Sequence, residues 1–339
     1  MKKYFKLVVI FIITIAVIFL VFYCCQKTDI QYFTPENPEY INYNNYVHDT
    51  RGYDFGYMDY RDGQFAYNNP KFLGLTGSVF TIDVAGESQK LKGVNAPFQF
   101  CNEGIIYLNK DSLIYRDVYD DETEISSNVC SFMAWETKVL FMHNFEWSDE
   151  IGNWIHDELY IYDIQTGEIK TLINGVDYYL IYDNNVYVVV ENSDGNCSLC
   201  SISLETYDSQ FICGLHISAF PYSFQISNDV LVWYGVEGAY FDIMDLNTLE
   251  WRTLPVPGGP HKLNFMCEGD IIYYSYLGLI RDGSFNWTDK NNEHNGTWEL
   301  NIISGERERI TTKYYDKLYC FDKVHLYGYD CESGVEKIK

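Results

Sequence analysis

Short runs of aromatic and β-branched residues, separated by tight polar turns, recur along most of the chain. In the stretch ELYIYDIQTGEIKTL, Glu158–Leu172, apolar and polar positions alternate on both sides of a polar turn. Alternate residues of a strand face opposite sides of a sheet, so this spacing predicts two antiparallel strands joined by a hairpin. Related hairpins follow Val79, Ala239, Leu300 and His325.

A second kind of hairpin precedes the first in most repeats. It consists of an aromatic strand, a polar turn and an apolar strand, and examples begin at Phe98, Phe132, Tyr179, Phe224 and Leu263. Its turns are rich in Asn, Asp and Gly, which tolerate positive φ or bond their own backbone. Two hairpins in succession predict a unit of four short strands.

An acceptor side chain recurs where the third strand of the unit ends. The positions are Asp83, Asp163, Asp245, Asn301 and Asp330. Glycines that can supply a positive φ follow at Gly86, Gly167, Gly305 and Gly334. A short acceptor at a strand end can hold the next backbone N–H groups as an Asx turn. Because these residues recur at one register, we interpret them as turn formers and not as catalytic carboxylates.

The repeated unit sets the expected architecture. Seven units begin near Tyr53, Ala96, Ser131, Tyr178, Tyr222, Lys262 and Lys313. One four-stranded unit cannot bury both of its faces, so neighbours must stack. Radial repetition of such units describes a β-propeller, predicted here as seven four-stranded blades over residues 53–339, with six or eight as alternatives. A β-solenoid usually has shorter repeats, and a sandwich would not repeat the same double hairpin.

Three stretches of the repeat, LYIYDIQTGEIKTLINGV, GIIYLNKDSLIYRD and VLVWYGVEGAYFDIMDLNT, carry a family resemblance. They resemble bacterial extracytoplasmic propellers of the TolB-like and low-density-lipoprotein-receptor-like type. The resemblance covers about residues 53–339 and implies a propeller behind a signal or a single membrane anchor. These are structural turn motifs, and the group implies no shared catalytic residues.

The N-terminus predicts a membrane anchor. Leu7–Cys25 is an uncharged run of 19 residues without Pro or Gly, and three of the six residues before it are Lys. At about 1.5 Å per residue, the run nearly spans a hydrocarbon core of roughly 30 Å. The positive-inside rule places residues 1–6 in the cytoplasm and the propeller outside the cell membrane. A lipoprotein signal at Cys24 and a cleaved secretory signal are alternatives, although bulky Tyr23 suits neither. Residues 26–52 form a stalk or a segment that closes the ring.

Composition narrows the possible partners and chemistry. A formal net charge of -24 and the absence of a basic patch beyond residues 1–6 exclude nucleic acid as an expected partner. Aromatic residues make up 17% of the chain, which argues against disorder. Cys197 and Cys200 form a CxxC pair, but residues three apart in a strand face opposite sides. We therefore expect no metal site and no cofactor, and no catalytic motif is found.

Two long connections between hairpins, residues 143–158 and 276–296, define the candidate site. Both join a second strand to a third, so we expect them on one face of the propeller, where long loops are commonly functional. The candidate ligand-binding residues are Phe145, Trp147, Trp154, Phe285, Trp287, Asp149, Glu150, Asp289 and Glu293. Aromatic planes flanked by carboxylates suit a surface protein, a peptide or a glycan. The alternative is that these aromatic side chains fold back and cap the blades.

The function expected from these features is a membrane-anchored, extracytoplasmic binding module. The alternative is a propeller-fold hydrolase or lyase that acts on cell-surface glycan or peptide with carboxylates gathered around the central channel. A purely structural stalk or assembly module is a third possibility.

Overall fold

The structure is a computed structural model, and its described residues cover most of the repeat region. They are 48–49, 58–61, 64–69, 78–82, 88–94, 97–102, 104–143, 146–148, 153–155, 158–191, 197–215, 224–235, 240–257, 261–282, 285–320, 325–330 and 334–339. The predicted anchor Leu7–Cys25 lies outside them. Within the described ranges, no helix has both the length and the apolar character needed to cross a membrane.

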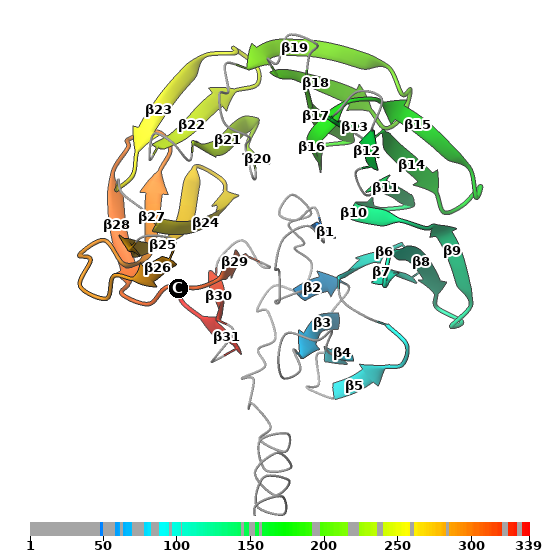
Figure 1. Ribbon diagram of the computed structural model, residues 1–339, viewed down its shortest axis with the longest axis horizontal. Helices are drawn as coiled ribbons and strands as arrows, with labels where there is room; N and C mark the ends of the chain where they lie inside the picture. The colour runs from blue at the N-terminus through cyan, green and yellow to red at the C-terminus, as the bar shows by residue number, and fades with distance from the viewer. Residues whose placement is uncertain are drawn as a thin grey trace, which may run out of the picture.

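Small antiparallel sheets stand around a common centre, as expected for a β-propeller (Figure 1). Blade 1 consists of β2 (Met58–Arg61), β3 (Gln64–Asn69), β4 (Ser78–Ile82) and β5 (Ser88–Leu91). Blade 2 consists of β6 (Phe98–Cys101), β7 (Gly104–Asn109), β8 (Ser112–Asp117) and β9 (Glu122–Ser126). Blade 3 consists of β10 (Val129–Trp135), β11 (Lys138–His143), β14 (Leu159–Asp163) and β15 (Ile169–Ile173).

The remaining sheets continue the ring in sequence order. Blade 4 consists of β16 (Val176–Tyr182), β17 (Asn185–Glu191), β18 (Cys197–Ser203) and β19 (Ser209–Leu215). Blade 5 consists of β20 (Phe224–Ser227), β21 (Val230–Gly235), β22 (Tyr240–Asp245) and β23 (Trp251–Pro255). Blade 6 consists of β24 (His261–Glu268), β25 (Ile271–Asp282), β27 (Gly296–Asn301) and β28 (Arg307–Thr311). A last sheet consists of β29 (Lys317–Tyr319), β30 (Tyr327–Asp330) and β31 (Gly334–Lys337).

The prediction of seven four-stranded blades was wrong. The described chain forms six such blades, and the unit expected from Lys313 is a sheet of three strands. The backbone of Tyr315, placed in a first strand by the prediction, bonds side chains of blade 6 instead. Asn264 Nδ2 donates to the Tyr315 carbonyl at 2.6 Å, and the Tyr315 N–H donates to Ser275 Oγ at 2.7 Å. This stretch is therefore used to join the last sheet to blade 6.

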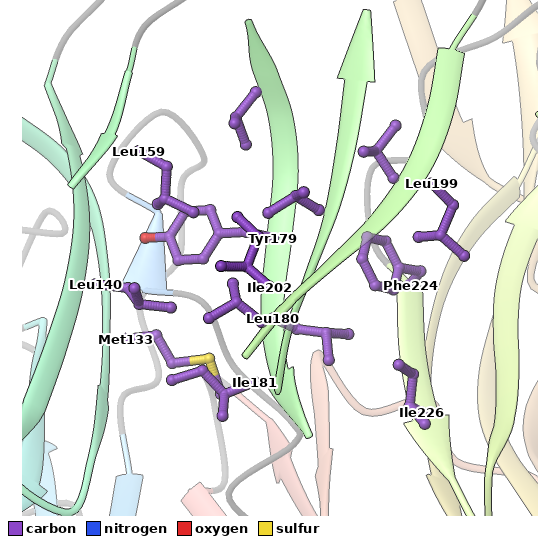
Figure 2. Close-up of a cluster of buried hydrophobic side chains, with 14 of the residues drawn as sticks. Met133, Leu140, Leu159, Tyr179, Leu180, Ile181, Leu199, Ile202, Phe224 and Ile226 are labelled. Carbon is purple, nitrogen blue, oxygen red and sulfur yellow. The ribbon is translucent and has the colours of Figure 1, made fainter. Parts of the chain in front are cut away.

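Aromatic and aliphatic side chains fill the space between blades. Figure 2 shows a cluster in which Met133, Leu140 and Leu159 of blade 3 meet Tyr179 and Ile181 of blade 4. On its other side blade 4 meets blade 5, where Phe224 and Ile226 are 2% and 1% exposed. Blade 4 thus buries both of its faces against its neighbours, which is the physical reason for the stacking expected from the sequence.

The recurring acceptors at the end of the third strand form the expected turns. Asp163 Oδ1 accepts the N–H groups of Gln165 and Thr166 at 2.8 and 3.3 Å. Asp245 and Asn301 make the same pair of bonds, and Ser203 makes it in blade 4. The turn-former interpretation of Asp163, Asp245 and Asn301 is confirmed, whereas Asp83 lies outside the described residues.

The residue type at the left-handed position of these turns varies more than the sequence suggested. Gly167 and Gly305 adopt φ of 72° and 73°, as predicted. Tyr207 and Leu249 adopt φ of 62° and 58° at the equivalent positions of blades 4 and 5. Residues other than Gly therefore adopt a strained backbone conformation there, because the hydrogen bonds of the turn fix the backbone.

Two buried glutamines join neighbouring blades. Gln99 of β6 donates from Nε2 to the Ala134 carbonyl at 3.0 Å and accepts the Ala134 N–H at 2.8 Å. Gln225 of β20 donates to the Phe265 carbonyl at 2.8 Å and accepts the Cys267 N–H at 2.7 Å. Each amide pairs with backbone groups on the innermost strand of the next blade, where no further strand of that blade follows.

A short strand outside the blades lies within the ring. β1 (His48–Asp49) pairs antiparallel with β10, with His48 opposite Phe132 and Asp49 opposite Ser131. Figure 1 shows β1 beside β10, toward the centre. The sequence prediction that YINYNNYV, residues 40–47, closes the ring falls outside the described residues.

Candidate functional site

Both long connections expand the same end of the propeller. Each blade is an up-and-down sheet, so the connections from a second strand to a third all emerge on one face. In blade 3 this connection carries β12 (Glu146–Ser148) and β13 (Asn153–Ile155). In blade 6 the long strand β25 continues beyond its neighbours and pairs with β26 (Phe285–Thr288). We call this end the insert face, defined by β12, β13, β26 and residues 289–296.

The aromatic residues of the blade 3 insert face each other in the backbone register. β12 and β13 form a two-stranded antiparallel ribbon in which Trp147 is directly opposite Trp154. Two tryptophans predicted from separate parts of the loop are thus cross-strand neighbours. Three other candidates of this loop, Phe145, Asp149 and Glu150, lie outside the described residues.

The blade 6 insert presents an apolar pair to solvent. Ile280 of β25 and Trp287 of β26 are register partners, and they are 52% and 61% exposed. Phe285 is opposite Asp282 at the tip of the same ribbon. Trp287 is therefore not folded back over the blade. The alternative interpretation, in which these aromatic side chains cap the blades, required it to be buried there.

The acidic candidates after β26 differ in role. Asp289 Oδ1 accepts the Asn291 N–H at 3.1 Å, so its carboxylate shapes the turn. The Glu293 side chain is 86% exposed, and its Oε1 lies 3.6 Å from His294 Nε2. Asn295 holds the exit of the insert, since its Oδ1 accepts the Gly278 N–H at 2.7 Å and its Nδ2 donates to the Asp289 carbonyl at 2.7 Å. Of the two carboxylates, Glu293 is the one that is presented to solvent.

A cluster of aromatic and histidine side chains supports the blade 6 insert. The His261 ring stacks on Tyr276 with ring centres 4.9 Å apart, and His261 Nε2 bonds the Tyr234 hydroxyl. His294 meets the Tyr276 ring edge-on at 6.4 Å. Tyr276 is fully buried, and this burial raises the pKa of its hydroxyl. The blade 6 insert therefore lies above a packed cluster of aromatic and histidine side chains.

Blade 3 carries a comparable cluster beneath its own insert. Phe141 and Tyr160 stack with ring centres 5.3 Å apart, and the His143 ring lies 4.8 Å from Tyr160. The Tyr160 hydroxyl donates to Glu158 Oε2 at 2.7 Å, and His143 Nε2 lies 2.9 Å from Ser126 Oγ. Sequence reasoning missed both clusters, because each gathers side chains from more than one strand and its members share no motif.

One carboxyl group is held in an environment that disfavours its charge. Asp242 lies on β22, opposite Trp233 and Thr253, and Thr253 Oγ1 donates to its Oδ1 at 3.1 Å. Burial raises the Asp242 pKa above its ordinary value, against the opposing hydrogen bonds from Thr253 and Trp233. The group lies on the third strand of blade 5, away from the innermost strands where catalytic acids were expected in the enzyme alternative.

The raised Asp242 pKa predicts a pH-dependent difference between the wild type and Asp242→Asn. The folded state binds this proton more tightly than the unfolded chain, so the Asp242 contribution to stability falls as pH rises from the unfolded pKa through the folded one. We expect the variant to be more stable than the wild type at about pH 7, and the difference to shrink toward about pH 4. Thermal melts of both proteins across this range measure it. A difference that does not change with pH would contradict the argument.

Cysteines and metal ligands form no site in the described part of the chain. Seven cysteines lie within the described ranges: Cys101, Cys130, Cys197, Cys200, Cys213, Cys267 and Cys320. Cys197 Sγ lies 3.8 Å from Asp177 Oδ2, and Cys200 is placed three residues further along β18. Among the described residues there is no group of three or more His, Cys, Asp or Glu side chains arranged to hold a metal ion.

Comparison with known proteins supports the fold. No family model matches the chain, and no curated protein matches it. Among solved structures, the chain is similar to a prolyl endopeptidase, with TM-score 0.54 and 13% identity, over 76% of this chain and 41% of that one. It is also similar to an oligogalacturonate lyase in complex with manganese, with TM-score 0.53 and 13% identity, over 87% of this chain and 90% of that one.

A third similar structure is the dipeptidyl peptidase 4 of Porphyromonas gingivalis, with TM-score 0.51 and 9% identity, over 78% of this chain and 47% of that one. The chain thus spans less than half the length of both peptidases. At these identities the likeness shows the propeller fold alone. The finer resemblance to TolB-like and low-density-lipoprotein-receptor-like propellers stays a prediction.

Proposed function

We propose that the protein is a membrane-anchored, extracytoplasmic β-propeller that binds a surface protein, a peptide or a glycan through its insert face. Leu7–Cys25 would hold it in the cell membrane with residues 1–6 in the cytoplasm. The exposed pair Ile280–Trp287 is the observation that carries the proposal. A tryptophan that is 61% exposed on a paired strand, above a packed base, presents a rigid apolar plane at low entropic cost.

The charges around Ile280 and Trp287 restrict the chemical class of the ligand. Glu293 and the net charge of -24 favour cationic or neutral ligands over anionic ones. Sugar rings and the apolar side chains of a peptide both stack on an indole face. Trp147 and Trp154, which are register partners on the blade 3 ribbon, would extend the proposed surface.

Trp287→Ala should remove most of the binding while leaving the fold intact. An aromatic residue at the centre of an interface commonly contributes 2 kcal/mol or more, so we expect affinity to fall by at least about tenfold. Immobilised wild-type protein would first be used to isolate partners from envelope extracts and to screen glycan arrays, and each hit would then be titrated against the variant. Trp251→Ala is the matched control, because Trp251 is 43% exposed on β23, away from both inserts. Equal loss in both variants, or none in Trp287→Ala, would contradict the proposal.

An enzyme remains the second candidate, a hydrolase or lyase acting on cell-surface glycan or peptide. It is favoured by the similarity to the lyase, which extends over 90% of that chain. The test is turnover of oligogalacturonate with and without added Mn²⁺, and of peptide substrates without it. Turnover that survives Trp287→Ala would favour the enzyme over the binding module.

A further inference from the structure

The inner edge of β10 has a recurring set of backbone groups that face the centre of the ring. In an antiparallel strand the N–H and C=O of one residue point to the same side, and residues two apart repeat that direction. Ala134 points both groups away from β11, since Gln99 bonds both. Phe132, two residues before it in β10, must point the same way, and Glu136 follows in the turn with φ of 50°.

Blade 2 covers two of these three positions. The Gln99 amide bonds both backbone groups of Ala134, and the Asn102 N–H donates to the Glu136 carbonyl at 2.8 Å. The third position, Phe132, lies directly opposite His48 of β1. By the same parity, His48 and Phe132 form the hydrogen-bonded type of pair.

Blade 6 shows the same edge in a case where the described residues add no strand beside β24. Phe265 and Cys267 of β24 correspond to Phe132 and Ala134 of β10 in the aligned repeats. There Gln225 spans both residues, with its Nε2 on the Phe265 carbonyl and its Oε1 on the Cys267 N–H. The equivalent amide beside blade 3 is that of Gln99, and it bonds both backbone groups of Ala134. Phe132 pairs with His48 of β1 instead.

We propose that the inner edge of β10 at Phe132 is a strand-binding site, and that its resident occupant is the segment of this chain that carries His48 and Asp49. The ligand class is an extended peptide backbone, added as a strand beside β10. The site is short, because Gln99 ends it at Ala134 and the irregular pairing at Val129–Ser131 ends it on the other side. Covering this edge also protects it from pairing with other chains. The inference does not rest on the proposed function of the insert face.

The test uses the full-length chain in detergent micelles and one backbone change. His48→Pro removes the N–H that faces Phe132, whereas His48→Ala removes the side chain and keeps the backbone. We expect the Phe132 amide to exchange hydrogen at least about tenfold faster in His48→Pro than in the wild type or in His48→Ala. Circular dichroism and a thermal melt confirm that the blades, which do not include residue 48, remain folded.

A second measurement supplies the occupant in trans. A fluorescein-labelled synthetic peptide with the sequence of residues 44–53 should bind His48→Pro at least about tenfold more tightly than the other two proteins, because the tethered segment competes at high effective concentration. The same peptide with Pro at the His48 position should not bind. Equal exchange of the Phe132 amide in all three proteins, or a peptide that binds all of them alike or none of them, would overturn the proposal.

Discussion

Replacing Gln225 with Met lowers the free energy of unfolding by about 3 kcal/mol. Gln225 is 5% exposed, and its amide bonds two backbone groups of β24, at 2.8 and 2.7 Å. Met has nearly the same shape, so the substitution leaves the Phe265 carbonyl and the Cys267 N–H without the bonds that replaced water. Each unsatisfied buried group costs about 1–3 kcal/mol. Because the bonds join two blades, their loss weakens the ring and not only one sheet.

Thermal melting of the wild type and Gln225→Met measures this cost, with an expected fall in Tm of about 5 °C for a propeller of this size. Gln210→Met is the matched control, since Gln210 is exposed on β19 and should change stability by no more than about 0.5 kcal/mol. Gln99→Met should resemble Gln225→Met, because Gln99 makes the same kind of clamp between blades 2 and 3. Equal melting of Gln225→Met and Gln210→Met would show that the clamp contributes nothing.

The hairpins could be predicted from sequence because their signals are local. Asp163 and Gly167 form one turn, and the bonds that Asp163 Oδ1 accepts come from residues two and three positions later. Alternation of apolar residues on either side of the turn then sets which face is buried. The same local signal overcounted the blades, since residues 313–339 carry the hairpin pattern while Tyr315 bonds Asn264 and Ser275 of blade 6.

Contacts between blades could not be predicted in the same way. Gln99 bonds Ala134, 35 residues later, and the His261 ring stacks on Tyr276 of the next strand and bonds Tyr234 of the preceding blade. A weak signal existed for the clamps, because Phe-Gln occurs at the same register in blades 2 and 5. The aromatic loops of the candidate site were located correctly between second and third strands, but only the structure shows that Trp287 is exposed beside Ile280.

Gly296 closes the blade 6 insert at a point where no side chain fits. It begins β27, opposite Tyr276, with φ of 132°, a conformation that residues with a Cβ rarely adopt. A Cβ placed there meets the Thr311 carbonyl oxygen and lies 3.0 Å from Thr312 Cα. Both neighbours are backbone atoms of the adjoining strand and its exit, so neither can move without breaking the pairing of β27 with β28.

Gly296→Ala should therefore lower the free energy of unfolding by about 3–5 kcal/mol, the sum of backbone strain and overpacking. Gly214→Ala is the matched control, since a Cβ there meets nothing within 4 Å and no positive φ is required. We expect Gly214→Ala to be neutral or to stabilise the protein by about 0.5 kcal/mol, because Ala restricts the unfolded chain. Thermal melts of the two variants measure this difference. If Gly296→Ala and Gly214→Ala melt at the same temperature, the backbone at the exit of the insert is not fixed as described. If the exit is fixed, Gly296→Ala should also weaken ligand binding at Trp287, since Asn295 beside it holds both Gly278 and Asp289 at the base of that ribbon.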